Sequence, residues 1–109
     1  MTTPVLLSLY VAENERHHGD LLYDWILERA RTLGLPGGSV FRAIAGYGRH
    51  GTLHQERFFE IAANLPIQVE FVVSDEQAKQ LLSLLGAEQL SLPYTIQPVQ
   101  FGFTAPSAG

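Results

Sequence analysis

The sequence predicts a single α+β domain in which two amphipathic helices lie on one face of an antiparallel sheet. Three observations support this fold class: short segments rich in strand-forming residues, two segments whose apolar residues recur at helical spacing, and the order in which the two kinds alternate. Because 109 residues suit one hydrophobic core, we expect residues 1–109 to form one domain, with 104–109 as a flexible tail.

A strand and a helix begin the chain. Val5 to Val11 is a short apolar run, and polar residues end it at Glu13. From Asp20 to Gly34, apolar side chains recur every three or four residues, which predicts a helix that Asp20 caps and Gly34 ends.

Two strands come next. Ser39 to Ala45 alternates in strand fashion until Gly46 ends it, and Pro66 to Ser74 alternates apolar with other residues. The proline stands at the start of its strand, where its missing N–H group does not interrupt the hydrogen bonds inside the ladder. Between the two strands, residues 54–66 fit helical and strand periodicity alike, and both interpretations stay open.

A second helix and a last strand complete the domain. Ser74 and Gln77 have the spacing of a capping box, so a helix should start there and run to Gly86. Residues 94–103 then predict an edge strand, because Pro98 cannot donate a ladder hydrogen bond. The resulting order, βαββαβ, is that of the ferredoxin-like fold.

The strands carry more apolar surface than two helices can bury. This excess predicts an oligomer that packs sheet against sheet. The residues concerned are Val5, Leu7, Leu9, Phe41, Val72, Phe101 and Phe103.

Composition excludes several classes of function. A net charge of -4 and a pI near 5.4 argue against broad binding to a nucleic-acid backbone. The absence of cysteine excludes disulfides and thiolate zinc sites, and no apolar stretch is long enough to span a membrane. With no signal-peptide pattern either, we expect a cytoplasmic protein without membrane insertion. The chain has no Gly-x-Ser-x-Gly elbow, cysteine nucleophile or partnered acid pair, so we interpret it as a non-enzyme.

The hexapeptide GYGRHG at residues 46–51 is the strongest candidate for a binding site. Its glycines allow backbone conformations that point successive N–H groups at one anion, and Arg49 would add a planar, charged donor pair. Tyr47 offers a ring for stacking and His50 a contact that changes with protonation. The residues alone leave a structural turn and an anion site as alternatives, because glycine most often marks turns.

Four histidines raise the alternative of a metal site. His50 and His54 would share one face of a helix, and His17 and His18 are adjacent in sequence. No cysteine joins them and glycines disfavour a helix at 51, so we predict no metal site, with His50 and His54 as the weak candidates.

The order of these motifs resembles a known family. The stretch LYVAENERHHGDLLYDWILERARTLGLPGGSVFRAIAGYGRHGTLH, followed by NLPIQVEFV, resembles the PII-like family called domain of unknown function 190, from about Leu6 to the last strand. The most specific parts are the acidic residue after the first strand, the glycine before the helix, the Gly-Tyr-Gly segment, His54 and the Leu-Pro pair before the third strand.

The resemblance extends to PII signalling proteins and implies a function. In them, a glycine segment ending the second strand lines an adenine-nucleotide site between the subunits of a trimer. The matching positions are Gly46, Tyr47, Gly48, Arg49 and His50, with Glu70 near the ribose and adenine. The resemblance thus implies a homotrimeric regulatory protein that binds a nucleotide and controls a partner, by analogy a membrane transporter or channel.

One departure from PII proteins affects the ligand. The stretch LSLLGAEQLSLPYTIQPVQFGF contains no Lys or Arg, whereas PII proteins place basic residues there for a triphosphate. AMP or ADP is therefore expected rather than ATP. The alternatives are a CutA-like trimeric metal-binding protein that uses the histidines, and an assembly subunit without a ligand.

Overall fold

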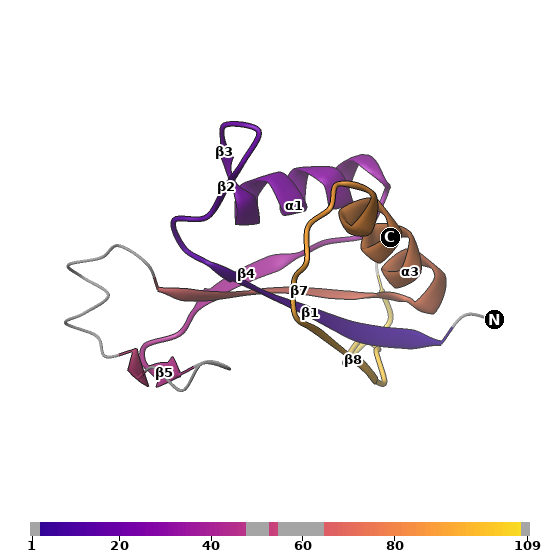
Figure 1. Ribbon diagram of the computed structural model, residues 1–109. Coiled ribbons are helices and arrows are strands. Elements are labelled where there is room, and N and C mark those ends of the chain that lie inside the picture. The colour runs from indigo at the N-terminus through magenta and orange to yellow at the C-terminus, as the bar shows by residue number, and fades with distance from the viewer. Residues whose placement is uncertain (1–2, 48–52, 55–64, 108–109) are drawn as a thin grey trace.

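The chain folds into two layers, a sheet and a pair of helices. A computed structural model describes residues 3–47, 53–54 and 65–107. Helices α1 (Leu22–Thr32) and α3 (Asp75–Ala87) lie together on one side of a four-stranded antiparallel sheet (Figure 1). No helix in the described part of the chain is long and apolar enough to cross a membrane.

The sheet has the strand order of a ferredoxin-like fold. Its strands are β1 (Pro4–Ala12), β4 (Ser39–Arg42), β7 (Pro66–Ser74) and β8 (Tyr94–Pro98), arranged as β4-β7-β1-β8. The central pair, β1 with β7, runs in unbroken register from Pro4 opposite Ser74 to Ala12 opposite Pro66. This arrangement confirms the predicted βαββαβ architecture with both helices on one face.

The core lies between the sheet and the helices. Every second residue of β1 and β7 points toward the helices, and these residues pack against one apolar stripe on each helix. The buried apolar side chains are Val5, Leu7, Leu9, Val11, Leu22, Ile26, Ala30, Leu35, Ile67, Val69, Phe71, Val73, Ala78, Leu81 and Leu85. Val5, Leu7 and Leu9 are thus covered by the helices, so the prediction that they contribute to an excess of apolar surface was wrong.

A short hairpin, missed by the sequence analysis, precedes α1. Strands β2 (Arg16–His17) and β3 (Asp20–Leu21) pair with each other beside the first turn of α1. The prediction that Asp20 caps α1 was wrong, because Asp20 belongs to β3 and Leu21 occupies the cap position without a side-chain hydrogen bond. The helix ends as expected, with Gly34 in the left-handed conformation (φ 83°) just beyond it.

Two predicted strands are shorter than expected because their partner strands end. β4 stops at Arg42, and the backbone N–H of Ala43 makes the last bond, to the carbonyl of Pro66 where β7 begins. β8 stops at Pro98 instead of residue 103, because Val99 bonds to Pro4 at the start of β1 and no strand continues beyond. Residues 55–64, for which the sequence left a helix and a strand as alternatives, lie outside the described residues.

Helix α3 begins at the predicted capping box. The Ser74 side chain accepts from the backbone N–H of Gln77 at 3.1 Å, and the Gln77 side chain accepts from the backbone N–H of Ser74 at 3.0 Å. The helix continues one residue past Gly86 to Ala87, and Gln89 then adopts a left-handed backbone (φ 60°). The residues that follow turn back toward the sheet.

Removing the capping box should destabilise the fold measurably. Ser74→Ala leaves the Gln77 N–H without its acceptor, which should lower the free energy of unfolding by about 1 kcal/mol. Urea denaturation followed by circular dichroism measures this loss. The control is Ser83→Ala, at an exposed position of the same helix. An equal loss in both variants would contradict a specific role for the cap.

A second stability prediction concerns the glycine before β4. A Cβ atom on Gly38 would lie 2.5 Å from Cε1 of Phe71, whose ring is buried in the core. Gly38→Ala should therefore overpack the core and cost about 1–3 kcal/mol. Gly86→Ala is the matched control, since a Cβ there meets no described atom within 4 Å and alanine favours the helix by up to about 1 kcal/mol. Thermal unfolding of both variants should show opposite shifts.

Candidate functional site

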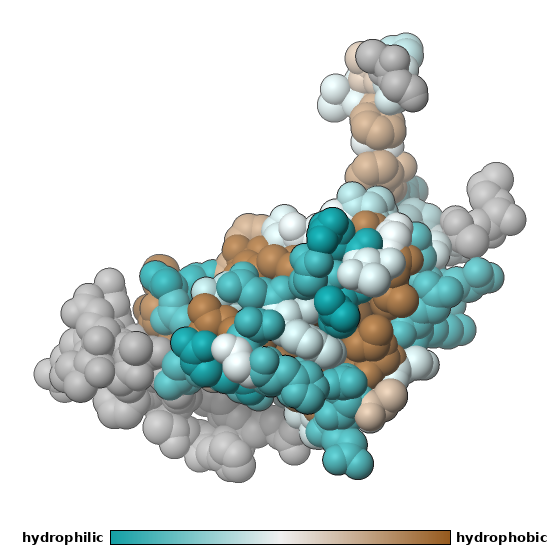
Figure 2. All heavy atoms as spheres, turned by 90° about the horizontal axis from the view of Figure 1, so that it is seen from above, coloured by the Kyte–Doolittle hydropathy of each residue, from teal (hydrophilic) through white to brown (hydrophobic). Residues whose placement is uncertain are grey.

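The sheet face opposite the helices is covered by no described element. The alternation of the strands places Leu6, Tyr10, Phe41 and Val72 on this face. Phe41 is 53% exposed, while Tyr10 and Val72 are each 38% exposed. The helix side, in contrast, shows hydrophilic residues over much of its described surface (Figure 2). The open sheet face is therefore the more apolar side of the molecule.

A polar group lies in the middle of this apolar face. The amide of Gln68 donates to the Glu70 carboxylate at 2.5 Å and to the Ser8 hydroxyl at 3.4 Å. Ser8 is the one buried polar residue in the described chain, and it lies opposite Glu70 in the β1–β7 ladder. The set holds the Glu70 carboxylate in a fixed position beside apolar side chains.

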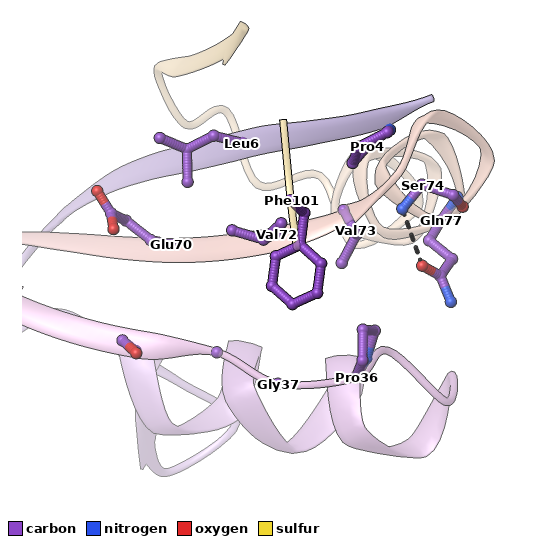
Figure 3. Close-up of a pocket in the computed structure, with 12 residues that line it drawn as sticks. Pro4, Leu6, Pro36, Gly37, Glu70, Val72, Val73, Ser74, Gln77 and Phe101 are labelled. Carbon is purple, nitrogen blue, oxygen red and sulfur yellow. Dashed lines mark hydrogen bonds between the residues drawn. The ribbon is translucent and has the colours of Figure 1, made fainter. Parts of the chain in front are cut away.

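An open hollow of about 630 Å³ adjoins Glu70. Leu6, Val72 and Phe101 form its apolar wall, and the segment from Pro36 to Ser39 forms the opposite side (Figure 3). Such a surface can hold a flat apolar ring, while a carboxylate at its edge accepts hydrogen bonds from hydroxyl groups of a ligand.

The glycine segment begins in a second short hairpin. Gly46 and Tyr47 form β5 (Gly46–Tyr47), which pairs with β6 (Leu53–His54) so that Gly46 lies opposite His54. His54 is therefore in a strand and not in the helix that a shared face with His50 would need, which agrees with the expectation that glycine disfavours a helix there. Gly48, Arg49 and His50 lie outside the described residues, and their role stays a prediction.

The described part of the glycine segment, Gly46 and Tyr47, and the residue Glu70 lie at different places along the sheet. β5 lies beyond the end of β4, at the edge of the sheet where β7 begins (Figure 1). Glu70 stands four residues further along β7 than Pro66, a distance of about 13 Å at the usual rise per strand residue.

The loop after β1 is attached to the exit of β4. The carboxylate of Glu13 pairs with the guanidinium of Arg42, and the backbone N–H of Glu13 donates to the carbonyl of Leu65 at 2.7 Å. These contacts attach the acidic loop to the end of β4 and to the residue before β7. The Arg42 side chain is 60% exposed, so the role of the pair is to position the loop more than to stabilise the fold.

A third group of polar side chains lies on the helix side. Nε2 of His17 and Nε2 of His18 lie 2.8 and 2.9 Å from the same oxygen of Glu88. The hydrogen bond from His17, followed by that from His18, lowers the pKa of the Glu88 carboxyl below its ordinary value. Sequence analysis considered the histidines but missed Glu88, because a residue 71 positions away shows no spacing signal.

The fold and the open sheet face define a class of protein: a ferredoxin-like α+β domain with one helix-covered face and one uncovered face. Within this class, residues 4–100 match the family model of domain of unknown function 190, described as "Uncharacterized ACR, COG1993". The chain belongs to this family.

Two relatives support the assignment. A "UPF0166 protein" of Aquifex aeolicus is 39% identical over 95 residues, which cover 87% of this chain and 90% of the relative. A UPF0166 protein of Methanocaldococcus jannaschii is 30% identical over 80 residues, or 73% of each chain. The similarity spans nearly the whole domain and carries no assigned activity.

The contacts of Glu88 should make stability depend on pH in the acid range. Because its pKa is lowered in the folded protein, the stabilisation is present above the ordinary pKa and is lost as the pH falls through the lowered value. The difference in unfolding free energy between the native protein and Glu88→Gln should therefore shrink on acidification. Urea denaturation at a series of pH values, with a chelator present, measures it.

The control for this experiment is the same substitution in a His17→Gln, His18→Asn background. With both partners removed, Glu88→Gln should give a difference that no longer changes with pH. A pH-dependent difference that survives in this background would show that other groups are responsible.

Proposed function

We propose that the protein is a regulatory binding module: a homotrimer that binds a small adenine nucleotide between subunits and controls a partner protein. It works without catalysis, and AMP or ADP fits better than ATP. The observation that carries the proposal is the hollow beside Glu70 on the open, apolar sheet face.

The open face supports oligomer formation. Phe41, Val72 and Phe101 are 53%, 38% and 63% exposed, and large apolar side chains on one face of a sheet favour burial against another subunit. The separation of Glu70 from Gly46 supports the same conclusion. In a closed ring, the glycine segment of one chain could reach the sheet of its neighbour.

The chemistry of the two halves suits a nucleoside monophosphate or diphosphate. Leu6, Val72 and Phe101 provide an apolar surface for a purine ring, and the Glu70 carboxylate can accept hydrogen bonds from ribose hydroxyls. The glycine segment would supply backbone N–H groups and Arg49 for phosphate oxygens. Residues 80–107 contain no Lys or Arg, so charge partners for a third phosphate are few.

Regulation would act through the segment that follows the glycines. A nucleotide that contacts Arg49 and His50 changes the conformational preferences of this segment, and a partner that binds one state would then sense the ligand. By analogy with PII proteins, the partner is a transporter or channel, and the protein acts in the cytoplasm.

Calorimetric titration tests this proposal. AMP, ADP and ATP are titrated with and without Mg²⁺ into the native protein, Arg49→Ala and Glu70→Gln. We expect about one nucleotide bound per chain and a loss of affinity of tenfold or more in each variant, since each removes a charged partner. Arg31→Ala and Glu76→Gln, exposed residues of the helices, are the matched controls.

Light scattering on the same samples tests the assembly. The native protein and both site variants should have about three times the 12.1 kDa mass of the chain. A stable monomer would contradict the trimer, and a trimer without heat from any nucleotide would contradict the ligand while leaving the assembly in place.

A further inference from the structure

We propose that His17, His18 and Glu88 form a binding site for a divalent transition-metal ion, Zn²⁺ or Cu²⁺, that connects the β2–β3 hairpin to the end of α3. This site lies on the helix side of the molecule. It is independent of the nucleotide site proposed on the open sheet face.

The three donor atoms already converge. Nε2 of His17, Nε2 of His18 and a Glu88 oxygen all lie within 4.8 Å of one another. Tetrahedral Zn²⁺ with bonds of about 2.0–2.2 Å holds its ligand atoms roughly 3.3 Å apart. The two shortest separations, 2.8 and 2.9 Å, would need to open by only about half an ångström, which side-chain rotation provides.

The backbone of the hairpin directs both imidazoles to one point. His18 and Gly19 form the two-residue loop of the hairpin, and both have positive φ (52° and 86°), as is usual in such loops. A residue other than glycine is uncommon in this conformation, and here it brings the ring of His18 to 4.0 Å from that of His17. The ring of Trp25 packs edge-on against His17 at 4.5 Å and fixes its orientation.

The electrostatics at the end of α3 favour a cation. Glu88 stands at the C-terminal cap of the helix, where the helix dipole and a carboxylate are both negative, and the last turn of α3 contains no basic residue. A divalent ion at this point would neutralise both.

The ligand set selects the kind of metal. Two imidazoles and one carboxylate suit Zn²⁺ and Cu²⁺ better than Mg²⁺ or Ca²⁺, which prefer oxygen ligands. Three protein ligands leave a fourth position for water or another molecule. The His18 side chain is 66% exposed, so an ion can enter from solvent, while His17 is only 14% exposed and anchors the site.

Calorimetric titration of ZnCl₂ into tag-free protein tests the site. We expect one Zn²⁺ per chain, with at least a tenfold rise in Kd in each of His17→Gln, His18→Asn and Glu88→Gln, because each removes one ligand. The matched control is Glu76→Gln, a glutamate at the other end of α3, and His54→Asn tests whether the weak candidate at the glycine segment binds the metal instead. Both should bind Zn²⁺ as the native protein does.

The single tryptophan gives a second, local readout. Trp25 lies 4.5 Å from the ring of His17 and 6.3 Å from that of His18, so Cu²⁺ bound there should quench its fluorescence. The quenching should saturate at one equivalent and be lost in Glu88→Gln. If His17→Gln fails to fold, the loss of quenching in Glu88→Gln and His18→Asn still tests the site.

Several outcomes would overturn the proposal. These are no saturable uptake of either metal, unchanged affinity in all three variants, or a loss of affinity in His54→Asn alone. The last result would place metal binding at the glycine segment. Because the ligand variants leave Arg49 and Glu70 intact, AMP or ADP binding should persist in them, so failure of one proposal is distinguishable from failure of the other.

Discussion

The antiparallel pairing of β1 with β7 is the constraint on which the rest of the structure depends. Nine residue pairs, in unbroken register, fix which side chains of both strands face the helices. A shift of β1 by one residue relative to β7 would turn Leu7 and Leu9 out of the core and Ser8 into it. The same register therefore builds the core on one face and the polar group beside the candidate hollow on the other.

Sequence reasoning succeeded where the signal was local. The capping box of Ser74 and Gln77 and the alternation after Pro66 each depend on residues a few positions apart, and the structure has both as expected. It failed at the ends of β4 and β8, because strand-like residues continue there after their partners have ended. Strand composition is visible in a sequence, whereas the end of a partner strand is a property of the tertiary fold.

The candidate sites follow the same division. The glycine hexapeptide is contiguous, so its residues alone made it a candidate. Glu70 became a candidate only through the resemblance to PII proteins. The His17, His18 and Glu88 group was invisible, because it joins a two-residue hairpin to the end of a distant helix. Strands of two residues show no periodicity in a sequence. The turn between them has His18 in the left-handed backbone conformation, where glycine or asparagine is the usual residue, so the turn gave no sequence signal.

The central place of the N-terminal strand has a consequence for how the protein acquires its structure. β1 lies between β7 and β8, so its ladder partners are strands that are synthesised more than 50 residues after it. Until residue 66 and beyond have left the ribosome, the apolar side chains of β1 have neither ladder partner nor helix α3 to cover them. Contacts between residues this distant in sequence slow folding, and the apolar strand is exposed and prone to aggregation until they form. In the nascent chain, β1 therefore stays without its ladder partner until β7 has been made.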